Sequence, residues 1–526
     1  MNASLKRVLV TGATGYVGGR LIPYLLESGY HIRAMGRSMK KLASRSWAGH
    51  HDVELVEADV FDLSSLKKAC QECFAAYYLV HSMNTPYTSG KDTKFISLGL
   101  KTFDEADRIA AQNMRDAAAS ECIERLIFLG GLGEETRGPL SRHLKSRHEV
   151  AAILKEGPVP VTHLRAAMIL GSGSASFEIM RYLVERMPVM FTPHHIKTLN
   201  QPIAIRNVLY YLRECLAIEK TKDRTFDIGG PDISTYKELF DIYAEEAGLK
   251  KRVIIPLPFV SPEMCANFIH LISPVPKAIA APLTEGLRNP VICRDNSIKE
   301  LIPQRLINSR ETIRRALNRV RSESVETCWS DAGCLLPPEW VYCGDESFSG
   351  GSVLECGYKA GLNKKPDIIW PFIKNIGGQS GWYFSDYLWQ LRGNLDRIMG
   401  GIGIKRGRRN DSSMRIGDAL DFWRILEITP PKRLVLLAEM RVPGEAVLEF
   451  NLISVGKNDS EIQVLARFLP KGLMGMAYWY ALFPAHQYLF TGLINSIAKR
   501  SNAKLTNKPR RFTPKIPKGC RLPEIF

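Results

Sequence analysis

The stretch Thr11-Gly12-Ala13-Thr14-Gly15-Tyr16-Val17-Gly18-Gly19 decides the fold of the first part of this 526-residue chain. It follows the apolar run from Leu5 to Val10, which predicts a strand, and it opens a segment that we predict to be a helix. Gly12 permits a tight turn, Gly15 keeps the backbone open to a close ligand, and Gly18 lets the helix pack closely on the strand.

A turn of this kind suits the diphosphate of a dinucleotide, because the amino terminus of a helix offers N–H groups and a partial positive charge. The residues that we expect to contact a nicotinamide dinucleotide are Thr11, Gly12, Thr14, Gly15, Tyr16, Val17 and Gly18. The alternative is a plain strand, turn and helix whose glycines serve only the backbone.

Short apolar runs alternate with helical segments through the first half of the chain. The expected strands are Leu5 to Val10, His31 to Met35, Val53 to Val56, Ala76 to Val80, Arg125 to Leu129 and Thr162 to Ile169. Such alternation is typical of a parallel sheet with helices on both faces, joined by right-handed crossovers. The sequence therefore predicts an α/β class with a doubly wound Rossmann domain.

The end of the second expected strand bears on the choice of cofactor. An acidic residue there favours NAD(H), but this chain has Gly36-Arg37-Ser38 with Lys40 and Lys41 close behind. Arg37 suits the 2′-phosphate of NADP(H) through charge-assisted hydrogen bonds. We therefore expect NADP(H) to be preferred, with NAD(H) possible; the alternative is that these cations are solvated residues at a helix end.

These motifs resemble an atypical short-chain dehydrogenase/reductase of the NmrA-like and epimerase-like branch, over about residues 5 to 245. The resemblance places Asp59 and Val60, after the third strand, beside the adenine. It also places His81, Ser82 and Met83, which close the fourth strand, along the cofactor. For Asp59 a helix-capping role is the alternative.

The Tyr-x-x-x-Lys pair of active members of that superfamily is absent. His143 and Arg147 have the right spacing on one helical face, so His143 is a candidate to relay a proton and Arg147 to supply a fixed positive charge. The alternative is an ordinary polar helix. The run from Leu164 to Phe177 resembles the loop that borders the substrate cleft, although its small residues could equally serve a flexible turn.

The remainder of the first domain is less regular. Prolines between Pro256 and Pro290 predict short amphipathic pieces that cover either a substrate cavity or the sheet. The basic helical segment Ile298 to Val320 is expected to connect to the second domain. We place the first domain at residues 1–325, with a cofactor half at about 1–245 and an extension at 246–325.

The second domain, expected at 326–500, changes to strand periodicity. Alternating apolar residues predict antiparallel strands at Leu434 to Met440, Ala446 to Leu452 and Ile462 to Phe468, followed by a helix from His486 to Lys499. Aromatic and charged motifs between about 355 and 497 resemble the uncharacterised domain behind bacterial atypical dehydrogenase-like proteins, which implies a helix-grip-like α+β fold. Its aromatic residues suggest either a cavity for an apolar ligand or an ordinary core.

The net charge and the cysteine spacing limit the kinds of partner and metal site that we expect. The net charge of +17 favours acidic partners, but no nucleic-acid-reading module is recognisable. Basic residues gather at 405–409 and in a tail at 501–526, which we expect to be a solvated extension, or else an arm that makes weak contact with a membrane surface or a partner. No export signal or spanning segment is apparent, so we expect a cytoplasmic protein with reduced thiols. The spacing of Cys328, Cys334, Cys343 and Cys356 matches no zinc site, and we expect no metal.

Two functions stay open from the sequence. The intact glycine turn favours an NADP(H)-dependent oxidoreductase with an unknown, possibly lipophilic substrate. The missing tyrosine and lysine favour a non-catalytic NAD(P)-binding sensor, regulator, or accessory or assembly factor of respiratory complexes.

Overall fold

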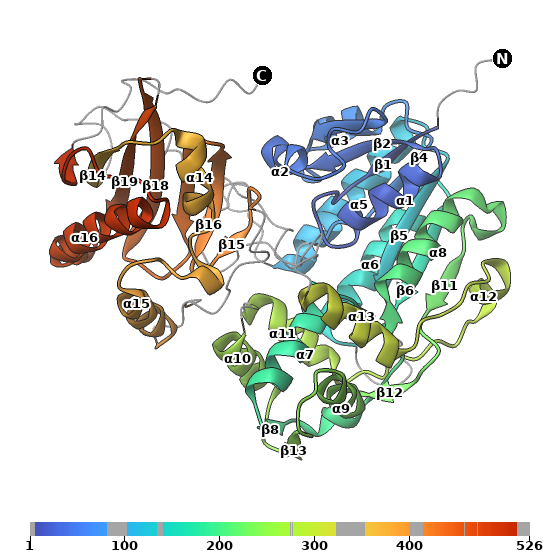
Figure 1. Ribbon diagram of the computed structural model, residues 1–526. Helices are drawn as coiled ribbons and strands as arrows, with labels where there is room; N and C mark the ends of the chain where they lie inside the picture. The colour runs from blue at the N-terminus through green and yellow to red at the C-terminus, as the bar shows by residue number, and fades with distance from the viewer. Residues whose placement is uncertain are drawn as a thin grey trace. The chain divides into compact units, whose positions relative to one another are not determined.

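The computed structural model describes residues 6–81, 102–133, 140–273, 275, 277–321, 353–398, 403, 414–456, 458–470 and 472–512. The chain divides into two compact units, Met1–Cys334 and Leu335–Phe526 (Figure 1). The expected domain boundary near residue 325 lies outside the described residues, as do Ser82, Met83, Cys328, Cys334, Cys343, the basic cluster at 405–409, and residues 513–526.

A seven-stranded parallel sheet forms the centre of the first unit, with the strand order β11-β6-β5-β4-β1-β2-β3. Its strands are β1 (Arg7–Val10), β2 (His31–Gly36), β3 (Val53–Glu57), β4 (Ala75–Tyr78), β5 (Arg125–Gly131), β6 (Val161–Ala166) and β11 (Thr225–Ile228). Every neighbouring pair is parallel. The predicted doubly wound Rossmann sheet is therefore confirmed.

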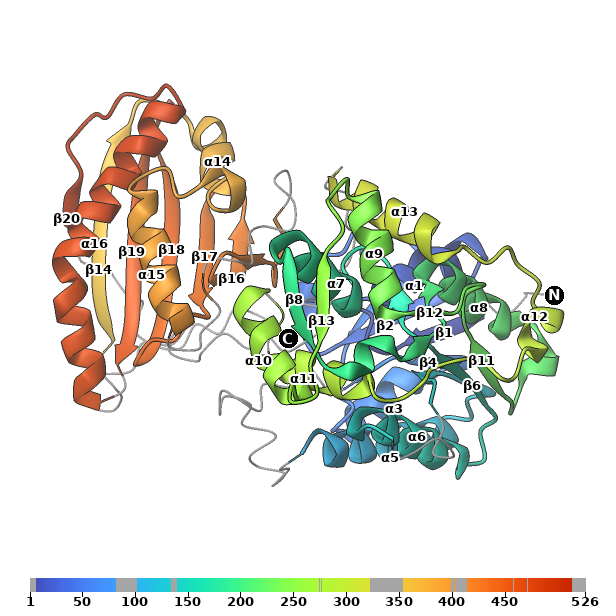
Figure 2. The same ribbon diagram turned by 90° about the horizontal axis from the view of Figure 1, so that it is seen from below.

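Helices cover both faces of this sheet (Figure 2). One face carries α1 (Gly18–Glu27) and α8 (Ile205–Ala217), whose apolar side chains share a core with β1 and β2. The other face carries α3 (Leu63–Cys70), α5 (Phe103–Ser120) and α6 (Arg142–Lys155). The short helix α2 (Met39–Ala43) follows β2, and α5 begins at a capping box in which Thr102 and Glu105 exchange hydrogen bonds.

Smaller elements form a second layer beyond the main sheet. They include the strands β7 (Ile169–Leu170), β8 (Val189–Thr192), β9 (Leu199–Asn200), β10 (Ile203–Ala204), β12 (Ser234–Thr235) and β13 (Val253–Pro256). The helices here are α7 (Ala175–Arg186), α9 (Tyr236–Glu246), α10 (Pro262–Ile272), α11 (Lys277–Gly286), α12 (Ser297–Leu301) and α13 (Ser309–Arg321). The short amphipathic pieces expected between Pro256 and Pro290 are thus α10 and α11.

We expect the segment Ile298 to Val320 to end the first domain and to lead to the second. This stretch forms α12, an extended break and α13, and it lies within the first unit. Helix α13 buries Ile313, Ala316 and Leu317 in a core shared with α7 and α9. Arg310 and Arg314 pair with Glu246 of α9, so the basic residues of this helix serve packing within the unit.

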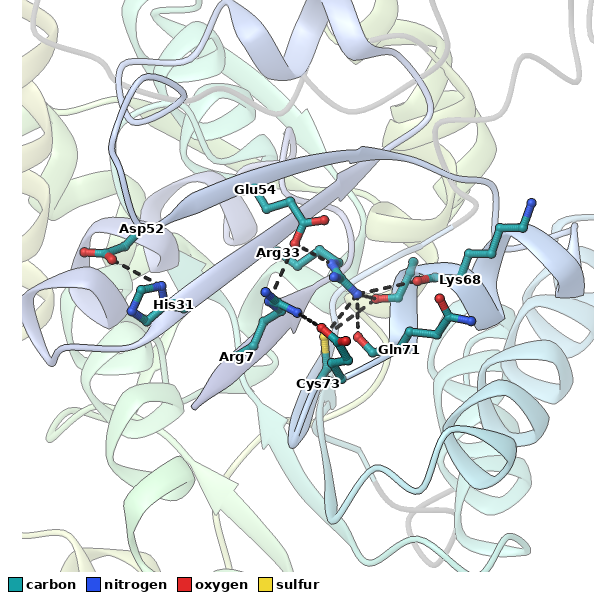
Figure 3. A network of polar contacts seen from close by, with 10 residues as sticks. Arg7, His31, Arg33, Asp52, Glu54, Lys68, Gln71 and Cys73 are labelled. Carbon is teal, nitrogen blue, oxygen red and sulfur yellow. Dashed lines mark hydrogen bonds and ion pairs between the residues drawn. The ribbon is translucent and has the colours of Figure 1, made fainter. Parts of the chain in front are cut away.

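A buried arginine holds β2 to its surroundings (Figure 3). Arg33 is 6% exposed and donates from Nε to Glu54 at 2.9 Å. Its Nη1 donates to the carbonyls of Ala69 at 3.2 Å and Gln71 at 2.5 Å, at the end of α3. The guanidinium thus donates to carbonyls at the helix end that lack helical donors, and the Cys73 thiol also donates to the carbonyl of Ala69 at 3.7 Å.

The second unit contains a seven-stranded antiparallel sheet in the order β15-β16-β17-β18-β19-β14-β20. The strands are β14 (Leu354–Leu362), β15 (Ala419–Leu420), β16 (Trp423–Thr429), β17 (Arg433–Ala438), β18 (Gly444–Val455), β19 (Asp459–Pro470) and β20 (Arg510–Phe512). The helices are α14 (Pro366–Lys374), α15 (Asp386–Ile398) and α16 (Gly472–Arg500). The predicted strands are confirmed, and α16 packs on β14 and β19 as Figure 2 shows.

The aromatic residues of the second unit pack against one another. Trp382 stacks on Trp389 with ring centroids 4.6 Å apart, and Phe422 and Trp423 join the same cluster. These contacts favour the alternative of an ordinary aromatic core. The helix-grip description stays a prediction.

Part of the expected basic tail is ordered structure. Residues 510–512 form β20, which pairs with Gly357 to Lys359 of β14, and Leu505 bridges to Leu362. The expectation of a solvated extension is therefore wrong for residues 501–512, because the edge of β14 offers unpaired backbone groups that this segment satisfies. None of the helices among the described residues combines the length and apolar character that crossing a bilayer requires.

Candidate active site

The glycine turn lies at the carboxyl end of β1, where the strand order reverses between β1 and β4. Ligands of doubly wound sheets bind in the crevice at this point. Thr11 fixes the turn to β4: its hydroxyl donates to the carbonyl of Tyr77 at 2.9 Å and accepts from the N–H of Leu79 at 3.1 Å. The first residue of the motif is thus a buried anchor for the backbone.

Each glycine of the turn meets a different spatial demand. Gly12 has a φ of +68°, and a Cβ there would lie 3.0 Å from the carbonyl oxygen of Leu79. A Cβ on Gly18 would lie 2.4 Å from the oxygen of Gly12, so α1 packs directly on the turn. A Cβ on Gly15 would have only that same oxygen within 4 Å, at 3.1 Å.

The turn fits a diphosphate. Within the described part of the chain, the N–H groups of Thr14 and Val17 donate no hydrogen bond, and both precede the first turn of α1. Free amides at a helix amino terminus are the usual ligands of phosphate oxygens. The glycine backbone and these amides therefore suit the cofactor predicted from the sequence.

Basic side chains follow β2 on the adenosine side of this crevice. Arg37 is partly exposed and forms no ion pair with any described residue, whereas Lys41 is buried. Arg45 was not identified from the sequence; its Nη2 donates to the carbonyl of Thr14 at 3.0 Å. Because α2 ends at Ala43, Arg45 lies beyond the helix, and no helical spacing marked it in the sequence.

Asp59 and Val60 lie in the loop after β3. The helix-cap alternative for Asp59 is wrong, because Asp62 caps α3 by accepting from the N–H groups of Ser64 and Ser65. Asp59 Oδ1 accepts from the N–H of Phe61 at 3.1 Å, and the carbonyl of Val60 accepts from Asn113 at 2.8 Å. The loop beside the expected adenine position is therefore held by its own hydrogen bonds.

His143 contacts His81 rather than standing alone with Arg147. Its Nδ1 lies 3.0 Å from Nε2 of His81, and the two rings stack with centroids 4.9 Å apart. His81 Nδ1 lies 3.2 Å from Oδ2 of Asp107, a residue of α5 that is 2% exposed. Asp107 was missed from the sequence, although it shares a helical face with the buried residues Ala110, Ala111 and Met114.

Burial controls the charge of these groups. Desolvation lowers the pKa of His143 well below its usual value, and His81 and Arg147 lower it further by charge repulsion. Burial likewise lowers the pKa of His81, with Asp107 opposing that effect. Both imidazoles are therefore neutral at pH 7.

Arg147 takes a different place from the one expected by analogy with the missing lysine. It is 4% exposed and donates to the carbonyls of Val80 at 3.3 Å and Leu129 at 3.2 Å. Its Nη1 lies 3.9 Å from Asp107 Oδ2, and Ser146 donates to the same oxygen at 2.9 Å. The positive charge thus balances the buried carboxylate.

A cavity of about 850 Å³ opens beside these residues, entirely within the first unit. Its lining includes Tyr16 and Val17 of the glycine turn and the contacting pair His81 and His143. Most of its lining is apolar: Leu79, Leu129, Leu132, Leu144, Met168, Ile179, Met180, Leu183, Met187, Met190, Ile196, Phe240, Ile269, Leu283 and Leu287. Val189, Phe191, Met264 and Phe268 both line this cavity and are exposed.

The expected substrate loop and the proline-rich segment border this cavity. Ser174 and Ser176 line it, and α10 and α11 contribute residues such as Thr284. Gly173 has a φ of +82°, and a Cβ on Gly171 would lie 2.5 Å from the hydroxyl of Tyr16. The small residues therefore serve both the backbone and the cavity.

Other candidate sites are weaker. Cys70 and Cys73 are buried free thiols, and burial raises the pKa of Cys70 to about 12 and that of Cys73 to about 11, so neither is a reactive thiolate. Among the described residues His50, His51 and Asp52 gather atoms that could hold a metal ion. However, His50 Nδ1 already accepts from the N–H of Asp52 at 3.2 Å.

Two family models match this chain. Residues 4–206 match the NmrA-like family, and residues 350–493 match a family described as a protein of unknown function, DUF2867. The NmrA-like resemblance is confirmed for the fold of the first unit, and the uncharacterised second domain is present.

Among curated proteins, cinnamoyl-CoA reductase 1 of Oryza sativa subsp. japonica is 25% identical over 142 residues, which cover 26% of this chain and 38% of the reductase. The protein of the same name from Petunia hybrida is 28% identical over 130 residues, which cover 24% of this chain and 35% of that protein. The chain thus spans little more than a third of the length of these relatives.

Solved structures also align with this chain. A nucleoside-diphosphate-sugar epimerase from Staphylococcus aureus aligns with a TM-score of 0.46 at 17% identity, covering 59% of this chain and 99% of the epimerase. The triphenylmethane reductase of Citrobacter sp., complexed with NADP(H), aligns with a TM-score of 0.45 at 20% identity, covering 59% and 99%. By strand order and parallel pairing the first unit is a Rossmann domain, and residues 4–206 of it match the NmrA-like family.

Proposed function

We propose that the first unit binds NADP(H) and catalyses the reversible reduction of a carbonyl group in an apolar substrate. The observation that carries this proposal is the position of His143, in the lining of a mostly apolar cavity that Tyr16 and Val17 of the glycine turn also line. The bound nicotinamide would supply or take up the hydride. His143 would supply or take up the proton, the role that tyrosine has in the resembled superfamily.

The lining of the cavity supports a lipophilic substrate. Apolar side chains form most of its lining, so binding removes apolar surface from water, while the fewer polar groups of the lining can orient the reacting group. The exposed residues Val189, Phe191, Met264 and Phe268 extend this apolar surface to the entrance. A polar sugar nucleotide would find few partners there.

The preference for NADP(H) rests on Arg37 and is tested by titration. The wild-type chain should bind NADPH at least about tenfold more tightly than NADH, because hydrogen bonds to a charged group contribute about 1.5–3 kcal/mol. Arg37→Ala should lose that difference and bind the two alike. Calorimetry measures both constants, and tighter binding of NADH by the wild type would contradict the preference.

Turnover separates the enzyme from the non-catalytic sensor. We expect NADPH oxidation with a lipophilic aldehyde or ketone from a panel, and a loss of about 100-fold or more in kcat in His143→Ala. Lys145→Ala, an exposed neighbour on α6, is the matched control and should retain activity. Tight NADPH binding without turnover of any compound in the panel would favour the sensor.

A further inference from the structure

Three side chains form a continuous chain of contacts from the cavity to the interior. His143 of α6 lines the cavity, His81 follows β4, and Asp107 of α5 is buried. The contacts are His143 Nδ1 to His81 Nε2 at 3.0 Å and His81 Nδ1 to Asp107 Oδ2 at 3.2 Å.

The ionised carboxylate fixes the proton positions along this chain. An unprotonated Nδ1 would bring its lone pair within 3.2 Å of a carboxylate oxygen, which only accepts hydrogen bonds, so we place the proton of His81 on Nδ1. His81 Nε2 then accepts, and the proton of neutral His143 must lie on Nδ1. The Nε2 atom of His143, the residue that lines the cavity, is left as a proton acceptor.

We propose that Asp107, His81 and His143 form a relay that stores one proton for the chemistry in the cavity. The inference rests on the proposed function for the direction of its use, because the nicotinamide is the redox partner and the relay moves only the proton. His143 is the catalytic residue, and His81 and Asp107 are positioning residues that act through it.

The transfer balances in both directions. When a substrate hydroxyl is oxidised, its O–H bond breaks and a bond forms between that proton and His143 Nε2. The proton on His143 Nδ1 passes to His81 Nε2, and the proton on His81 Nδ1 passes to Asp107. Carbonyl reduction reverses each step. The protonated carboxyl of Asp107 returns its proton to His81 Nδ1, His81 Nε2 returns its proton to His143 Nδ1, and His143 Nε2 donates its proton to the substrate oxygen.

This path avoids a buried imidazolium. Desolvation disfavours a positive charge on either histidine, and Arg147 repels it further. Moving the proton to Asp107 instead leaves all three groups neutral. In the resting state, Arg147 and Ser146 of α6 stabilise the ionised carboxylate, while Asp104 of α5 also acts on His81 by its charge.

Arg147 takes the sequence position that lysine has in the missing Tyr-x-x-x-Lys pair, but it makes different contacts. Arg147 stands four residues after His143, as lysine follows tyrosine in the resembled superfamily, but its contacts are Asp107 and two backbone carbonyls. Its charge therefore acts on the far end of the relay.

The proton positions can be measured without substrate or cofactor. In ¹⁵N-histidine-labelled full chain at pH 7, long-range ¹H–¹⁵N spectra distinguish imidazoles with the proton on Nδ1 from those with it on Nε2. We expect both His81 and His143 to be neutral with the proton on Nδ1, assigned from the spectra of His81→Gln and His143→Gln. A proton on His143 Nε2, or a charged His143, overturns the relay.

Matched variants test whether the Asp107 carboxylate determines the proton positions on the two histidines. Asp107→Ala removes the acceptor and should return His81 to the Nε2 form. Ser146→Ala removes one further contact of the same oxygen, keeps Arg147 beside it and should leave both signals unchanged. Unchanged tautomers in Asp107→Ala overturn the proposal. If that variant does not fold, the spectra of the wild type and of Ser146→Ala still show whether the proton of each histidine lies on Nδ1.

A kinetic measurement distinguishes this proposal from failure of the proposed function. With any ketone that the wild type reduces, Asp107→Asn keeps the shape of the side chain but takes up no proton. We expect kcat to fall about 100-fold or more, with KM and NADPH affinity within about twofold of the wild type. A kcat within about threefold overturns the relay, even where NADPH binding and turnover by the wild type uphold the function.

Discussion

At the scale of single residues, the glycine turn depends on distances that no larger side chain satisfies. Gly18 begins α1 against the oxygen of Gly12, and a Cβ there would lie at 2.4 Å from that oxygen, which belongs to backbone and has little room to shift. The approach of α1 to the turn therefore depends on this glycine.

Gly18→Ala should weaken NADPH binding at least about tenfold, because the helix amino terminus must move away from the diphosphate, and each factor of ten corresponds to about 1.4 kcal/mol. Gly49→Ala is the control, since a Cβ there has no atom within 4 Å. Calorimetry with NADPH measures both variants. Equal affinity of Gly18→Ala and the wild type would show that the turn does not hold the cofactor.

At the scale of secondary-structure elements, β2 is held by the Arg33 network of Figure 3. Arg33→Met removes a buried cation from Glu54 and from the carbonyls at the end of α3. We expect local stability to fall by about 3 kcal/mol, because buried acceptors lose their donors. Hydrogen exchange of the β2 amides should then accelerate about 100-fold.

Arg7→Met is the matched control for this prediction. Arg7 pairs with Glu54 and Glu72 in the same network but is more exposed, so its loss should cost less than about 1 kcal/mol. Similar exchange rates in the two variants would mean that burial of the guanidinium is not what stabilises β2.

In the second unit, α16 approaches its neighbours through Gly492. A Cβ there would lie 2.1 Å from Cε1 of Phe384, with two more atoms of that ring within 2.4 Å. Gly492→Ala gains about 1 kcal/mol of helix propensity but overpacks this contact at about 1–3 kcal/mol.

We therefore expect a net loss of up to about 2 kcal/mol in Gly492→Ala, measured by urea denaturation with hydrogen exchange of α16. Asn495→Ala, an exposed position on the same helix, should be neutral or slightly stabilising. A stabilised Gly492→Ala would show that Phe384 rotates away freely.

At the scale of the whole molecule, buried histidines make both units sensitive to acid. Burial lowers the pKa of His143 and His163 in the first unit well below the usual value, and that of His486 in the second unit to about 4. The unfolded chain binds these protons near pH 6.5. The free energy of unfolding therefore has its highest value, as far as these histidines contribute, above about pH 7. It decreases as the pH falls through 6.5.

His486→Phe tests this in the second unit, because the ring stacks on Phe490 and contacts Trp479 without a partner for its Nδ1 among the described residues. Between pH 7.5 and 5 the variant should lose about 2 kcal/mol less stability than the wild type, measured by urea denaturation. His51→Gln, at an exposed site of the first unit, serves as control. Equal acid sensitivity of His486→Phe and the wild type would contradict the assignment.

The sequence by itself determined the fold class, six strands of the parallel sheet, three strands of the antiparallel sheet and the glycine turn, because these follow from periodicity and glycine spacing that neighbouring residues encode. Tertiary structure alone decided that Asp107 meets His81, that Arg147 lies beside that carboxylate, that β11 and β14 complete the sheets and that residues 510–512 close the edge of the second sheet. The physical reason is that the burial of a residue and the distance to its partner depend on segments far apart in the chain. The local spacing of residues does not indicate which of these segments come into contact.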